Sequence, residues 1–281
     1  MIYLDHNATT PLEPRVREAM QPFLGEAFGN PSSVHRAGRR ARRAVEEARE
    51  QVAALLGAGE PEEVVFTSGG TEADALALFS ARGSRRRAVA VSAAEHPAVA
   101  EPARVLEAEG FERRVLPVLP SGELDLETAL ARIDAGLALV SVMAANNEYG
   151  AVFPIARLAE RARERGVRMH TDAVAATGKI DVGAGWGADM ISISAHKIGG
   201  PKGVGALWVR RGADVAALFP GGGQERRRRG GTENVPGIAG FGAAAHAAAE
   251  GLADYGALAV LRDMLEQRVL EICPAARAFG R

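Results

Sequence analysis

Cysteine and lysine are both scarce in this sequence of 281 residues. Its one cysteine, Cys273, excludes an internal disulfide framework and leaves no cysteine cluster for a metal. Lysine occurs only at Lys179, Lys197 and Lys202, and every other one of the 34 basic residues is arginine. Because a guanidinium group cannot lose its proton whereas an ammonium group can, these lysines are the first candidates for positions where chemistry requires a primary amine.

Long apolar runs and an excess of one charge are also missing. No stretch approaches the roughly 20 apolar residues that span a bilayer, and the N-terminus has neither the basic start nor the apolar centre of a signal peptide. The formal net charge is −1. Arginine-rich stretches at 39–43, 85–87 and 226–229 are therefore expected to be solvated faces. We expect a cytoplasmic protein that binds neither membrane nor nucleic acid.

Short β-rich runs alternate with helical patterns along the chain, which predicts an α/β fold with a mainly parallel sheet flanked by helices. Helices are expected over about 35–56, 71–81 and 97–109, and again from residue 246 toward the end of the chain. The predicted strands cover residues 63–68, 87–92, 111–118, 136–143, 166–173, 188–194 and 203–209. Ligands of open α/β sheets bind at the carboxyl ends of the strands, so the residues that follow each strand are the candidates for a site.

Glycines and polar side chains do follow several of these strands. The set consists of Gly70, Thr71, His96, Asn147, Asp172, Ser194, His196 and Lys197. A glycine turn that opens a helix favours an anion such as phosphate, although the same pattern also fits an ordinary tight turn with a threonine cap. Each residue has such a structural alternative, a helix cap or a packing role. Their convergence on one edge of one sheet instead predicts a site with a phosphate cradle, an acid, an imidazole and an amine.

Pyridoxal 5′-phosphate has the matching chemistry. Its aldehyde requires an amine that can shed its proton, which burial favours, and its ring nitrogen requires a carboxylate. We therefore interpret Lys197 as the Schiff-base residue, Asp172 as the partner of the ring nitrogen and His96 as the residue stacked on the ring. Lys202 is the second candidate amine. Lys197 is preferred because it directly follows a strand and because the preceding Ser-x-His can serve the phosphate.

Eight segments carry a resemblance to a known family. They are YLDHNATTPLEP, FGNPSSVHRAGRRAR, VVFTSGGTEAD, EHPAV, SVMAANNEYGAVFPI, HTDAV, SISAHKIGGPKGVGALWVRRG and GGGQERRRRGGTENV. In family order from residue 3 to about residue 250, they resemble the cysteine desulfurases, the class V branch of pyridoxal-phosphate transferases. The resemblance implies a fold-type I homodimer with shared active sites. It also implies that L-cysteine is the substrate, that alanine is the product, and that a sulfane sulfur passes to an acceptor or scaffold protein for iron–sulfur cluster or thiocofactor assembly.

The resemblance also assigns roles to individual residues. It supports the roles given above to Lys197, Asp172 and His96, and it places Asn147 over the cofactor near the substrate. Thr232 resembles a contact made from the neighbouring subunit, although it could instead cap a helix. The phosphate contacts implied by the resemblance are Gly70, Thr71, Ser194 and His196.

Two departures from the family pattern accompany these matches. The family has glutamine, bonded to the phenolic oxygen of the cofactor, where this chain has Ala175. The persulfide cysteine and the arginine that holds the substrate carboxylate would both follow Arg281. If the sequence continues beyond Arg281, the full desulfurase reaction is expected; if the protein ends there, it is expected to bind the cofactor with little or no persulfide transfer. Cys273 is expected to be a packed, structural cysteine.

The resemblance divides the chain into an N-terminal arm of a small domain (1–14), a large cofactor-binding domain (15–254) and the incomplete C-terminal part of the small domain (255–281). Two alternatives stay open: a class V aminotransferase or lyase that acts on another amino acid, and a non-catalytic subunit that transfers no sulfur. A panel of substrates distinguishes the first, and the absence of visible absorbance would indicate the second.

Overall fold

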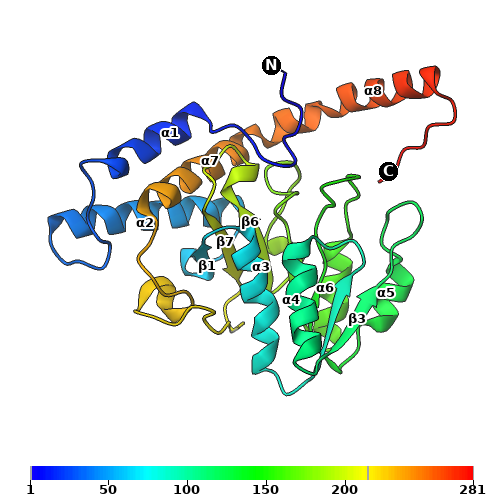
Figure 1. The fold of residues 1–281 in the computed structure, drawn as a ribbon, viewed down its shortest axis with the longest axis horizontal. Coiled ribbons are helices and arrows are strands. Elements are labelled where there is room, and N and C mark those ends of the chain that lie inside the picture. Colours follow the sequence, from blue (N-terminus) through cyan, green and yellow to red (C-terminus); the bar gives the residue numbers. More distant parts are fainter. Residues whose placement is uncertain (1, 214, 281) are drawn as a thin grey trace.

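A seven-stranded sheet lies at the centre of the structure, a computed structural model that describes residues 2–213 and 215–280 (Figure 1). The strand order is β1-β7-β6-β5-β4-β2-β3. All neighbouring pairs from β6 to β3 are parallel, and β7 runs antiparallel to both β6 and β1. The strands are β1 (Val64–Thr67), β2 (Ala88–Ser92), β3 (Glu112–Leu116), β4 (Leu137–Ser141), β5 (Arg168–Asp172), β6 (Met190–Ser194) and β7 (Gly205–Val209). The predicted mainly parallel sheet and the seven predicted strands are confirmed.

Two apolar layers cover the two faces of this sheet. One face packs against α3 (Gly70–Phe79) and α4 (Pro97–Ala108). The other packs against α2 (Arg36–Leu55), α5 (Leu126–Arg132), α6 (Ile155–Glu164) and α7 (Val235–Ala257). Strands β2, β4 and β6 are mainly apolar and are buried along their whole length, as expected of parallel strands that are covered on both faces.

The long helix α2 packs along α7, and both helices lie on the same side of the sheet (Figure 1). Residues 41, 44, 45, 48 and 52 of α2 are buried, which is the spacing of one helical face. Gly242 of α7 permits the close approach, since a Cβ there would lie 2.6 Å from the Cα of Ala48. The short helix α1 (Pro14–Met20) packs against α7 as well.

The N-terminal segment before α1 crosses the end of β6. The backbone N–H of Thr10 donates to the carbonyl of His196 at 2.9 Å, and that of Glu13 donates to the carbonyl of Gly199 at 2.9 Å. This segment forms neither helix nor strand over residues 2–13. It therefore lies against the strand end where the sequence places the amine, as an arm over the edge of the sheet.

The C-terminal helix α8 (Ala259–Ile272) continues from α7 and projects from the body (Figure 1). None of its residues is buried within the described part of the chain. The expectation that Cys273 is packed is wrong: this cysteine directly follows α8 and is exposed. The expectation rested on the absence of an electropositive setting for a reactive thiol, whereas exposure is decided by the position of α8, none of whose described residues is buried. The predicted division at residues 14 and 254 stays a prediction.

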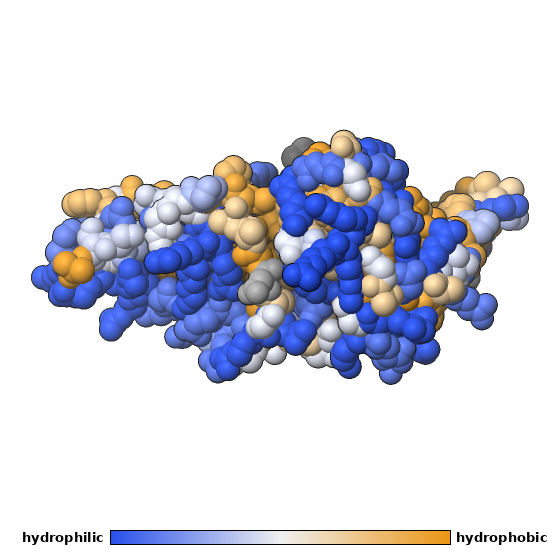
Figure 2. Space-filling model, turned by 90° about the horizontal axis from the view of Figure 1, so that it is seen from below, coloured by the Kyte–Doolittle hydropathy of each residue, from blue (hydrophilic) through white to orange (hydrophobic). Residues whose placement is uncertain are grey.

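The surface seen in Figure 2 is mostly hydrophilic, with hydrophobic residues in smaller groups. Among the described residues, no helix combines the length and the apolar character that crossing a membrane requires.

Candidate active site

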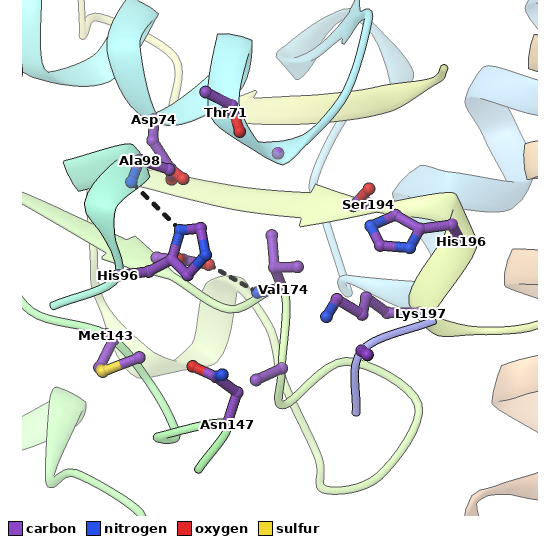
Figure 3. A pocket seen from close by; sticks show the side chains of 14 residues that line it. Thr71, Asp74, His96, Ala98, Met143, Asn147, Val174, Ser194, His196 and Lys197 are labelled. Atoms are coloured by element: carbon purple, nitrogen blue, oxygen red, sulfur yellow. Dashed lines mark hydrogen bonds between the residues drawn. The ribbon is translucent and has the colours of Figure 1, made fainter. Parts of the chain in front are cut away.

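A cavity of about 250 Å³ opens at the carboxyl ends of the strands (Figure 3). It contains eight of the nine site residues predicted from the sequence, and only Thr232 lies elsewhere. The lining residues are Ala8, Gly70, Thr71, Asp74, His96, Ala98, Met143, Asn147, Asp172, Val174, Ala175, Ser194, His196 and Lys197. Six segments that are far apart in the sequence thus meet there: the N-terminal segment and five segments that follow strands ending at one edge of the sheet.

One wall of the cavity is suited to an anion. Helix α3 begins there at Gly70, and its N-cap residue Gly69 offers no side chain to the free N–H groups of the first turn. A Cβ at Gly70 would lie 2.7 Å from Cγ2 of Val174 and 3.6 Å from Cβ of Ser194, so glycine keeps this space open. The Ser194 hydroxyl is buried without a hydrogen-bond partner among the described residues. Free backbone donors and an unpaired hydroxyl together fit a phosphate group.

The carboxylate of Asp172 lies at the end of β5 and is 6% exposed. Its Oδ1 accepts a hydrogen bond of 2.8 Å from the backbone N–H of Val174, which fixes its orientation. Burial raises the pKa of Asp172, while the N–H of Val174 and the charges of His96 and Lys197 oppose that rise. A protonated ring nitrogen would supply the cationic partner that this buried carboxyl group lacks.

The imidazole of His96 is held at the start of α4. Its Nδ1 accepts from the backbone N–H of Ala98 at 3.1 Å, so the neutral ring carries its proton on Nε2 (Figure 3). One oxygen of the neighbouring Glu95 is engaged in the fold: Oε1 accepts from the Ser92 hydroxyl and, at 2.9 Å, from the backbone N–H of Met143, whereas Oε2 is buried without a partner among the described residues. This carboxyl group connects the His96 loop to the end of β4, and burial raises the pKa of Glu95 to about 8.

The ammonium group of Lys197 projects into the cavity from a short 3₁₀ turn (Ala195–Lys197) that follows β6. It donates to the carbonyl oxygen of Asn7, in the N-terminal segment. Burial lowers the pKa of Lys197, opposed by the charges of Asp172 and Asp5. A lowered pKa is the property that an amine needs to attack an aldehyde near neutral pH.

The other two lysines occupy different environments. Lys202 is exposed in the turn between β6 and β7 and does not line the cavity. The ammonium group of Lys179 donates to the carbonyl of Ala175 at 2.8 Å. Burial is the main cause that lowers the pKa of Lys179 to about 8, and the positive charge of Lys197 is the second cause. Lys179 lines an adjoining cavity of about 450 Å³ that shares Asn147 and Ala175 with the first. Of the three lysines, only Lys197 reaches the predicted site.

The structure adds residues that the sequence reasoning missed. Asp74 and Met143 line the cavity, and Asn7 receives the lysine ammonium group. A signal was present for Asp74, because it lies three residues after Thr71 and therefore on the same face of α3. Nothing local marks Asn7, whose contact spans 190 residues of sequence.

Thr232 is exposed and lies by a separate cavity of about 110 Å³. The preceding loop is held to α3, since Nε of Arg229 donates to Oε1 of Glu72 at 2.9 Å while Oε2 of Glu72 accepts from the backbone N–H of Ser68. The contact of Thr232 with a neighbouring subunit stays a prediction.

The fold and this cavity define the general class of protein: the mixed sheet, with its site at the carboxyl ends of the strands, is that of fold-type I pyridoxal-phosphate-dependent transferases. The family described as aminotransferase class-V matches residues 2–271. A cysteine desulfurase of Cereibacter sphaeroides is 50% identical over 99% of this chain and 73% of its own length. A solved NifS-like protein is 38% identical with a TM-score of 0.93 over 97% of this chain and 76% of that one.

A further solved structure, SspA in complex with cysteine, is 36% identical with a TM-score of 0.84 and covers 87% of this chain and 72% of its own. The chain belongs to the class-V aminotransferase family and, within it, to the cysteine desulfurases. The resemblance carried by the eight sequence segments is confirmed.

Proposed function

We propose that this protein is a pyridoxal-phosphate-dependent cysteine desulfurase that removes sulfur from L-cysteine and leaves L-alanine. The observation that carries the proposal is the convergence of the Lys197 amine, the Asp172 carboxyl group and the N-terminus of α3 on one cavity. The similarity to SspA, solved with cysteine bound, supports the choice of substrate. In the reaction, L-cysteine and an acceptor thiol RSH give alanine and the persulfide RSSH, so the Cβ–S bond breaks and the sulfur leaves as a sulfane.

Pyridoxal 5′-phosphate, when bound, supplies an electrophilic aldehyde and a ring that accepts electrons. The residues that would hold its phosphate are Gly70, Thr71, Ser194 and His196. Asp172 would hold the ring nitrogen in its protonated form, and the ring of His96 would lie against the cofactor. Thr232 would contact the cofactor phosphate of a second copy, which makes a homodimer with shared sites part of the proposal.

Two residues would move or direct protons. Lys197, freed from Asn7, would act first as a nucleophile and then as a base that takes and returns the substrate proton, and its lowered pKa favours both roles. The Nε2–H of His96 faces away from the backbone donor that fixes Nδ1, so it can donate to the departing sulfur. Asn147, at the junction of the two cavities, would orient the substrate.

Replacement of Lys197 by alanine tests the proposal. The cofactor-loaded protein should be yellow, form alanine from L-cysteine in the presence of dithiothreitol, and carry a pyridoxyl label on Lys197 after borohydride reduction and digestion. Lys197→Ala should lose the label and lower the rate of alanine formation by at least about 1,000-fold. The matched control, Lys202→Ala, should keep both because Lys202 is exposed outside the cavity. A label on another lysine would overturn the assignment.

A panel of other amino acids tests the substrate. Faster turnover of a substrate without sulfur would favour an aminotransferase or lyase over a desulfurase. A colourless protein would indicate a non-catalytic subunit. A sulfur-acceptor or scaffold protein for iron–sulfur cluster or thiocofactor assembly, and a cytoplasmic location, complete the proposal.

A further inference from the structure

Asp74 is a carboxyl group in the wall of the cavity for which the proposed reaction has no role. It lies one turn into α3 and is 0% exposed. Neither of its oxygens has a hydrogen-bond partner among the described residues. Figure 3 shows the side chain extending from α3 toward the side of the cavity where His96 lies. An ionised Asp74 would be compensated for its burial only by the nearby hydroxyl of Ser192, which favours the ionised form but is outweighed by burial and by the charge of Asp172.

The groups that face Asp74 do not supply a positive charge. Asp172 comes from β5, and Glu95 comes from the loop before α4; both are acidic. His170 of β5 places Nε2 at 3.6 Å from Oδ1 of Asp74. That ring is already engaged, with Ser141 Oγ at 2.8 Å from Nδ1 and Ser192 Oγ at 2.9 Å from Nε2.

Burial keeps this histidine neutral, since it lowers the pKa of His170 to about 3. The ammonium group of Lys197 and the ring of His96 act electrostatically on Asp172, and neither is among the groups that act on Asp74. No arginine or lysine forms an ion pair with Asp74 in the described part of the chain. Burial, and then the negative charge of Asp172, raise the pKa of Asp74 well above its usual range.

We propose that Asp74 is a positioning residue that keeps its proton in the folded protein, so that of the two carboxyl groups on this wall only Asp172 ionises and holds the cofactor ring nitrogen. The protonated group would also give this wall of the cavity an O–H donor. The role toward the cofactor rests on the proposed function, whereas the retained proton belongs to the fold itself and can be tested without any cofactor.

The proton is tested by comparing the cofactor-free 281-residue protein with its Asp74→Asn variant in guanidinium unfolding at several pH values. The folded wild type retains a proton that the unfolded chain has lost above about pH 4. Raising the pH from 5 to 7 should therefore increase the unfolding constant of the wild type relative to the variant by about tenfold for each pH unit. The matched control is Asp181→Asn, at an exposed aspartate, for which the ratio should not change with pH.

A ratio for Asp74→Asn that stays constant with pH would overturn the proposal. A second measurement needs no variant. Wild-type protein labelled with ¹³C at the aspartate carboxyl carbons should keep at least one resonance at the position of a protonated acid up to pH 7, and its absence would be equally decisive against the proposal.

The positioning role is tested by titrating the cofactor-free proteins with pyridoxal 5′-phosphate and following visible absorbance. Asp74→Asn keeps a neutral donor and should bind within about threefold of the wild type, whereas Asp74→Leu, which has no donor, should bind about tenfold more weakly. Equal loss in both variants would mean that a charge at position 74 is required, and equal binding by all three proteins would exclude a positioning role. If the wild type bound no cofactor, the proposed function would fail while the pH result would still decide the proton.

Discussion

The ion pair between Arg49 and Glu225 is buried, with both side chains 3% exposed, and it offers a quantitative test of the structure. Nη1 and Nη2 of Arg49 donate to the two carboxylate oxygens at 2.7 and 2.8 Å. Glu225 also accepts from the backbone N–H of Phe66 at 2.9 Å, and Arg49 donates to the carbonyl of Val64 at 2.7 Å. The pair thus connects α2, β1 and the loop that leads to Thr232.

Replacement of Glu225 by glutamine would preserve its size but remove the buried counter-ion of the guanidinium group, leaving only the half-exposed carboxylate of Glu46, 3.2 Å from Nε of Arg49. Breaking a buried pair by removing one partner costs about 3–5 kcal/mol, so the free energy of unfolding should fall by about that amount. The assay is guanidinium unfolding of the wild type and the variant at pH 7. The midpoint and the slope of the free energy of unfolding against guanidinium concentration are compared between the two proteins.

Two further variants establish the cause. Glu109→Gln removes the carboxylate of the solvent-exposed Arg82–Glu109 pair and should destabilise the protein far less than Glu225→Gln does. Adding Arg49→Met to Glu225→Gln removes the buried charge and should recover part of the loss. The reasoning would be refuted if Glu225→Gln cost no more than Glu109→Gln.

Two more substitutions test the cavity and its surroundings. Gly70→Ala would place a Cβ 2.7 Å from Val174 Cγ2. It should destabilise the protein by about 1–3 kcal/mol and weaken cofactor binding in absorbance titrations. The control Gly25→Ala, with open space around its Cβ, should have neither effect. Because burial lowers the pKa of His170 to about 3, the unfolded chain takes up a proton below about pH 6.5 that the folded protein refuses. Lowering the pH from 6 to 4 should therefore reduce the free energy of unfolding by about 1.4 kcal/mol per pH unit. His170→Gln should remove that component and His246→Gln, at an exposed position, should not; identical acid unfolding of wild type and His170→Gln would contradict the assignment.

Local patterns in the sequence were sufficient for the sheet and for most of the candidate site. Apolar runs bounded by glycine and polar residues predict the strands, and a parallel sheet brings whatever follows each strand to a common edge. That reasoning requires no knowledge of distances, which is why Gly70, His96, Asp172 and Lys197 could be placed together from the sequence.

Tertiary structure alone decided which groups face one another across the fold. The contact of Asn7 with Lys197 spans 190 residues, and that of Arg49 with Glu225 spans 176, so no local pattern reports either. The state of Asp74 likewise depends on its zero exposure and its lack of a cationic partner, which are properties of the assembled core. The three lysines differ in how deeply the fold buries them, and Cys273 is exposed, against expectation. Neither result could be predicted locally, because the free energy of a buried charge or of an apolar side chain is set by its neighbours in space.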